Sequence, residues 1–190
     1  MNMRKIAALA LAVVLALSAA ACGGKSDSTQ GTEAQAVTPL DMLTTVWDGI
    51  PEDSRFPAMG GGYDNSVDNA PGEFDVSDTD NLDYLLSVPT ESAGLIQSAA
   101  SLLHMMNMNT FTCGAFQTAS SADAKTLAEA MHSSIAAKHW VCGFPDKMVI
   151  ATLGSNVVAM YGSEDLIDQF RDGLTGAYSD LNVLYDEPIL

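Results

Sequence analysis

The chain has 190 residues, of which 24 are acidic and 8 are basic, so its formal net charge at neutral pH is −16. Such an acidic excess argues against nucleic acid as a partner, because nucleic-acid binding depends on lysine and arginine contacts to phosphate. It also disfavours electrostatic docking to anionic lipid headgroups. The charge is typical of a solvated exterior protein, or of one that attracts cations or a basic partner.

The first 22 residues have the pattern of an export signal. Two basic residues precede an apolar run, Ile6–Ala21, and small residues lead into Cys22. The 16 residues of this run are fewer than the roughly 20 that a membrane-spanning helix needs, which favours a cleaved signal over a permanent anchor helix. We therefore predict a signal peptide at residues 1–21.

The cysteine that follows the small residues resembles the lipobox of bacterial lipoproteins, although Ala19 stands where leucine is usual. The resemblance implies that Cys22 becomes the first residue of the mature chain and carries acyl chains such as palmitate. Several acyl chains on one residue hold a protein firmly at a bilayer. We therefore expect a lipoprotein that is anchored to membrane lipid through Cys22, on the extracytoplasmic face of the cell membrane.

The mature chain begins with a stretch that has little to bury. Residues 22–37 are small and polar, which predicts a disordered tether. Residues 38–190 have the length of one ordinary domain. A helix is predicted at its start, from Thr38 to Gly49, because Thr38 suits the N-cap, Pro39 suits the first turn and Asp41 completes a capping box.

An acidic segment follows at residues 51–83, where apolar residues are sparse, so it is predicted to be a long loop with at most short elements. Clustered carboxylates suit a hard cation such as Ca²⁺. The stretch from Asp75 to Asp80, however, lacks the glycine and the closing glutamate of an EF-hand loop. A solvated acidic loop is therefore favoured over a calcium site.

A second helix is predicted at Glu91–Asn107, because apolar residues recur at helical spacing at Leu95, Ala99, Leu102 and Met106. The end of this segment contains His104 and neighbouring methionines, and imidazole and thioether groups bind Cu(I). Methionine at helical spacing more often fills a core, so we favour a packing role over a copper site.

The remaining residues alternate between strand and helix patterns. The predicted elements are a strand at 110–116, a helix at 120–138, two strands at 147–153 and 157–161 around a hairpin turn, a helix after Ser163, and a last strand at 181–185. This is the order of a ferredoxin-like βαββα(β) fold of the α+β class, with an antiparallel sheet and helices on one face. The α/β core would span residues 91–186, with extra N-terminal helices before it.

Two cysteines, Cys113 and Cys142, remain once Cys22 is acylated. An oxidising exterior would allow a disulfide between them, and two buried free thiols are the alternative. Either thiol beside His132 or His139 could form a nucleophile and base, and Cys113, His139 and Cys142 could hold zinc. Neither set matches a catalytic or zinc signature, so we predict no catalytic residue, no metal and no cofactor.

Three short sequences in the second half of the chain carry a further resemblance: Asn107–Phe111, Ala122–Ala124, and Gly143–Lys147 with the hairpin after it. Together with the leader and tether they resemble a family of uncharacterised lipoproteins from Gram-positive anaerobes, which carries a domain-of-unknown-function label. The resemblance covers roughly residues 91–178. It implies a location at the cell surface more than an activity.

The sequence therefore predicts a membrane-anchored, non-catalytic binding or accessory domain, with an envelope protein, a peptide or a small ligand as its partner. The alternative is a thiol- or histidine-based enzyme, or a metal-binding module, centred on Cys113, His139 and Cys142. A structural subunit of an envelope assembly is a third class.

Overall fold

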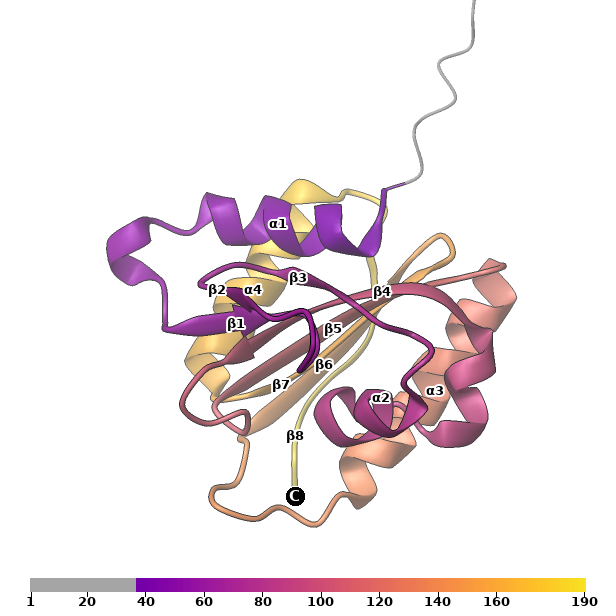
Figure 1. The fold of residues 1–190 in the computed structure, drawn as a ribbon. Helices are drawn as coiled ribbons and strands as arrows, with labels where there is room; N and C mark the ends of the chain where they lie inside the picture. Colours follow the sequence, from indigo (N-terminus) through magenta and orange to yellow (C-terminus); the bar gives the residue numbers. More distant parts are fainter. Residues whose placement is uncertain (1–36) are drawn as a thin grey trace, which may run out of the picture. The chain divides into compact units, whose positions relative to one another are not determined.

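An antiparallel sheet of eight strands runs through the fold, in the order β2-β1-β4-β5-β7-β6-β8, with β3 also paired to β4 (Figure 1). The computed structural model describes residues 37–190. The predicted signal peptide, Cys22 and all but the last residue of the predicted tether lie outside the described residues. The strands are β1 (Ala58–Gly60), β2 (Val67–Asp68), β3 (Gly72–Phe74), β4 (Ile96–His104), β5 (Phe111–Thr118), β6 (Lys147–Leu153), β7 (Asn156–Gly162) and β8 (Asn182–Pro188).

Helices cover both faces of this sheet (Figure 1). The helices are α1 (Pro39–Gly49), α2 (Thr79–Leu86), α3 (Ser121–Ala137) and α4 (Glu164–Ala177), with short 3-10 turns η1 (Glu52–Ser54) and η2 (Thr90–Leu95). The apolar stripes of α1 and α4 form one core with the sheet, and those of α2 and α3 form a second core on the opposite face. None of the described helices is long and apolar enough to span a membrane.

The start of α1 has the predicted capping box. The Asp41 amide donates to Thr38 Oγ1 at 3.1 Å, and the Thr38 amide donates back to the Asp41 carboxylate at 3.4 Å. Two of the amides that a helix start leaves unpaired are thereby satisfied. Asn156 Nδ2 also donates to the carbonyl of Val37 at 2.9 Å, which fixes the chain entering α1 against the sheet.

The helix predicted at Glu91–Asn107 is wrong: the structure places η2 and strand β4 there. The side chains from Ala99 to Leu103 are all buried, because β4 lies inside the sheet with a helical layer on each face. A strand buried on both faces reads as a continuous apolar run, so its period cannot separate strand from helix. The alternating pattern at 110–116 predicts a half-buried strand, but β5 is buried on both faces for the same reason as β4.

The predicted α+β class and antiparallel sheet are confirmed, but the ferredoxin-like arrangement is not. In that arrangement the last strand of the βαββαβ unit returns beside the first, whereas here β8 pairs with β6 and β4 lies beside β5. The chain has two crossovers, β5-α3-β6 and β7-α4-β8, and both move toward the β8 edge of the sheet. The strands in which they begin, β5 and β7, are antiparallel to each other. Right-handed crossovers then place their helices on opposite faces, which corrects the prediction of helices on one face.

Strand β8 lies at one edge of the sheet and is joined to α4 by a network of charges. Lys147 Nζ lies 2.6 Å from carboxylate oxygens of both Asp168 and Asp186, and Arg171 Nη1 lies 2.7 Å from Asp186. Partial burial raises the pKa of Asp186, but the hydrogen bonds from Lys147 and Arg171 outweigh it and hold that pKa below its ordinary value. The network therefore favours the ionised carboxylate and fixes the edge strand.

The acidic segment before β4 contains η1, three short strands and the start of α2. Its sequence predicts a long loop with at most short elements, and these elements are short. The outer edge of β4 is shared between two of these strands. β1 pairs with Leu102–His104, and β3 pairs with Ala99–Ser101. After Phe74 the chain leaves the sheet, so Ile96–Ser98 of β4 have no strand partner on this side.

Candidate functional site: a groove at the open edge of β4

Cys113 and Cys142 are free thiols, the first buried and the second exposed. They therefore form neither a disulfide nor a pair of buried thiols. Cys113 lies on β5 in the core beneath α1 and α4, and this burial raises the pKa of its thiol far above the usual range. Cys142 is exposed in the loop after α3, with a left-handed backbone (φ 65°). A fully buried thiol held neutral is a poor nucleophile and a poor metal ligand.

Within residues 37–190, no histidine is hydrogen-bonded to the thiol of Cys113 or Cys142. His132, on α3, places Nε2 2.7 Å from a carboxylate oxygen of Glu187 and stacks on Tyr185, so it joins α3 to β8. His139 is exposed in the loop after α3. The predicted nucleophile–base pairs and the zinc set of Cys113, His139 and Cys142 are therefore not assembled in the described part of the chain.

The residues considered for copper and calcium sites make local hydrogen bonds. His104 Nδ1 accepts the amide of Met106 at 3.2 Å, and the Met106 side chain is exposed rather than in a core. In the acidic segment, side-chain and backbone hydrogen bonds from Ser77 lower the pKa of Asp75, and Asp78 caps α2. Within residues 37–190, no group of three or more His, Cys, Asp and Glu side chains is arranged to hold a metal ion.

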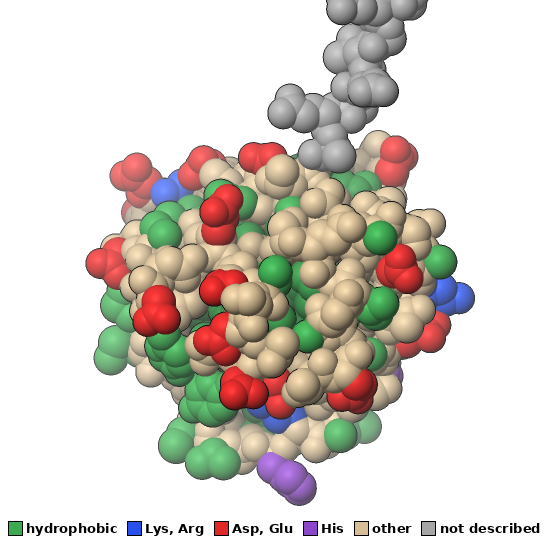
Figure 2. Space-filling view, turned by 45° about the vertical axis from the view of Figure 1, so that its right-hand side comes forward, with side chains coloured by type: hydrophobic (Ala, Val, Ile, Leu, Met, Phe, Trp, Pro, Cys, Tyr) green, Lys and Arg blue, Asp and Glu red, His purple; other side chains and the backbone are tan. Residues whose placement is uncertain are grey.

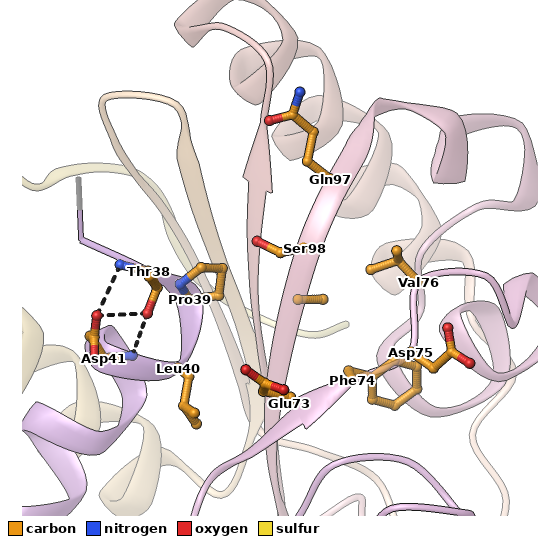
Figure 3. Close-up of a pocket in the computed structure, with 11 residues that line it drawn as sticks. Thr38, Pro39, Leu40, Asp41, Glu73, Phe74, Asp75, Val76, Gln97 and Ser98 are labelled. Carbon is orange, nitrogen blue, oxygen red and sulfur yellow. Dashed lines mark hydrogen bonds between the residues drawn. The ribbon is translucent and has the colours of Figure 1, made fainter. Parts of the chain in front are cut away.

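A groove of about 530 Å³ lies beside the unpaired end of β4 (Figure 3). We call it the β4 groove. It is lined by Thr38–Asp41 at the start of α1, by Glu73–Val76 at and beyond the end of β3, and by Gln97–Ala99 of β4. Figure 3 shows the α1 residues on one side and Val76 on the other, with Ser98 between them. The groove thus occupies the line that β3 would have followed.

The backbone of β4 is unpaired on one side at this groove. A strand without a neighbour exposes a row of N–H and C=O groups, which another extended chain can pair with. Residues Ile96–Ser98 form such a stretch, and β5 pairs with their other side. The pairing with β5 shifts register between Ile96 and Ser98, so the strand is irregular at this point.

All of the charged side chains that line the groove are acidic. Asp41, Glu73 and Asp75 line it, and its lining includes no lysine, arginine or histidine. Asp41 is engaged in the capping box and Asp75 accepts from Ser77, whereas no hydrogen bond or ion pair to the Glu73 carboxylate occurs within residues 37–190. Figure 2 shows acidic side chains spread over one face of the molecule, with few basic ones among them.

The chain matches no protein-family model, no curated protein and no solved structure. The resemblance to surface lipoproteins therefore stays a prediction, and a function for the described residues rests on their own geometry.

A second hollow, of about 400 Å³, is lined by residues of α2, of the loops that follow β4 and α3, and of β7. Lys138 lines this hollow, and its ammonium nitrogen Nζ donates to Ser87 Oγ at 2.7 Å and lies over the rings of Trp140 and Tyr161. A cation held over two aromatic faces and hydrogen-bonded to a hydroxyl is satisfied within the protein. We therefore interpret this cluster as a link between the end of α2 and the end of α3.

Two loops beside that hollow expose apolar side chains, with Met106 78% and Val141 75% exposed. They are held together by Asn107 Nδ2, which donates to the Cys142 carbonyl, and by Asn109 Nδ2, which donates to the carbonyl of Val141 at 2.9 Å. These contacts join the two loops.

Sequence reasoning did not find the β4 groove. The acidic pattern indicates Asp75 only as a calcium ligand, and the apolar spacing places Gln97 and Ser98 in a helix, which has no strand edge. The one signal in the sequence is the stretch Ala99–Leu103, which is apolar apart from Ser101 and is also what a strand buried on both faces produces.

Proposed function

We propose that this protein is an extracytoplasmic lipoprotein, anchored through acylated Cys22, whose folded residues form a non-catalytic binding domain. Its ligand is an extended segment of an envelope protein or peptide, which pairs with β4 in the β4 groove. The observation that carries the binding role is the edge at Ile96–Ser98, which no strand pairs on one side and of which Gln97 and Ser98 line a hollow of about 530 Å³. The leader sequence supports the location.

A thiol- or histidine-based enzyme has less support. Cys113 is buried, His132 is paired with Glu187, and His139 is exposed away from the core. Nucleophilic catalysis needs the nucleophile and its base within hydrogen-bonding reach, and these residues do not provide such a pair.

The anchor is tested by Cys22→Ser in the producing cell. We expect the wild-type chain in the membrane fraction, with an intact mass that includes acyl chains on Cys22, and the variant in the soluble fraction, because the thiol is the attachment point. Cys142→Ser removes an exposed thiol elsewhere and should leave the chain in the membrane. Membrane retention of Cys22→Ser, or a mature chain that starts at another residue, would contradict the anchor.

The binding role is tested on the unacylated mature chain, which carries Cys22→Ser and is labelled with ¹⁵N. The uncharged peptide Ac-Thr-Val-Thr-Val-Thr-NH₂ should shift the amide resonances of Ile96, Gln97 and Ser98, because strand addition gives these amides a new environment. The fully N-methylated peptide has no N–H donor and should leave them unchanged. Equal shifts with both peptides, or shifts confined to other residues, would contradict strand addition.

A further inference from the structure

The charges around the β4 groove define the ligand more closely than its shape does. We infer that the segment bound there is basic, with lysine or arginine at alternate positions and apolar residues between them. This inference deepens the proposed function and rests on it, because it presumes that an extended chain pairs with β4.

The carboxylates occupy both sides of the line that a bound strand would follow. Asp41 projects from the first turn of α1, and Asp75 lies beyond the end of β3 on the other side (Figure 3). Glu73 enters the groove from β3 itself: its neighbours Gly72 and Phe74 are buried while it is exposed. Like charges gathered in one hollow disfavour an acidic ligand and favour a cationic one.

Because side chains alternate along a strand, the placement of the carboxylates predicts a sequence pattern in the bound segment. Successive side chains of an extended segment point to opposite sides. With its backbone against Ile96–Ser98, one set of side chains would face the carboxylates at α1 and β3, and the other would meet the apolar surface of Phe74 and Val76. Glu73 is the best-placed acceptor, because its carboxylate has no partner among the described residues, while Asp41 and Asp75 each serve a local turn.

Two other occupants of the groove would give different results. The chain enters α1 at Thr38, which itself lines the groove, so the residues just before it are one rival. A second copy of the chain is the other, although every copy brings the same acidic rim. Both rivals are outcomes of the experiment below.

The experiment compares three peptides on the ¹⁵N-labelled, unacylated mature chain: Ac-Arg-Val-Arg-Val-Arg-NH₂, its threonine counterpart and its glutamate counterpart. We expect the arginine peptide to bind about tenfold more tightly than the threonine peptide at low salt, since each exposed ion pair makes a modest contribution and the peptide offers several. The glutamate peptide should bind most weakly. Raising the salt from about 20 mM to about 300 mM should remove most of the difference.

The variant Glu73→Gln identifies the acceptor. It should weaken binding of the arginine peptide about threefold and leave the threonine peptide unchanged, because only a charge interaction is removed. Glu52→Gln makes the same chemical change on an exposed residue outside the groove, and should alter neither affinity. Unchanged thermal unfolding of both variants would show that the fold is retained.

The outcomes separate this inference from the proposed function. Equal affinities for the three peptides, with shifts at Ile96–Ser98, would overturn the basic ligand and leave strand addition standing. No shift at those amides with any peptide would overturn both. Binding that appears only after deletion of residues 24–36 would make the chain's own tether the occupant, and shifts that depend on protein concentration alone would make it a second copy; either result overturns the inference.

Discussion

Trp47→Ala is expected to lower the free energy of unfolding by about 3–5 kcal/mol, the range for removing a large buried aromatic side chain. Trp47 is only 2% exposed and packs edge-on against Phe56, with ring centroids 5.1 Å apart. Its Nε1 donates to the carbonyl of Asn69 at 3.0 Å, and the Arg55 guanidinium lies over its ring. The variant loses apolar contact and also leaves the Asn69 carbonyl without this donor.

The chain has a matched control, because it contains one other tryptophan. Trp140 is half-buried and packs on Tyr161 at the surface of the second hollow, so Trp140→Ala should cost about 1–2 kcal/mol. Urea unfolding followed by circular dichroism measures both variants. Comparable losses for the two substitutions would show that Trp47 does not anchor the acidic segment to α1.

Local chemistry made much of this fold predictable. Thr38 with Asp41, and Ser120 with Asp123, identify the starts of α1 and α3, because a cap needs only residues within one turn. Gly154, with φ 59°, marks the turn between β6 and β7. Each of these signals lies within a few residues of the feature that it predicts.

The features that define the site depend on contacts between distant residues. Whether the run through Ala99–Leu103 is a helix or a central strand is decided by β5 and by β1 and β3, which pair with it from both sides. The open edge at Ile96–Ser98 exists only because the chain leaves the sheet after Phe74. The separation of Cys113 from Cys142 likewise follows from a buried strand and an exposed loop, and their spacing in the sequence does not encode it.

Gly60→Ala is expected to destabilise the protein by about 3 kcal/mol, at the upper end of the range for overpacking, because the obstacle is backbone rather than side chain. Gly60 ends β1 and Gly72 begins β3, and the two pair with the adjacent residues Leu102 and Ser101 of β4. A methyl group on Gly60 would overlap the Gly72 nitrogen and the Ala70 carbonyl oxygen. β1 and β3 must then separate, and one of them loses its register on β4.

Gly176→Ala makes the same change where nothing lies within 4 Å of the added methyl group, near the end of α4. It should stabilise the protein by up to about 1 kcal/mol, since alanine favours a helix over glycine. Urea unfolding should therefore give effects of opposite sign for the two substitutions. Because β3 lines the β4 groove, Gly60→Ala should also weaken binding of the threonine peptide, whereas Gly176→Ala should not. A loss of stability without a loss of binding would mean that β3 keeps its place in the groove without Gly60.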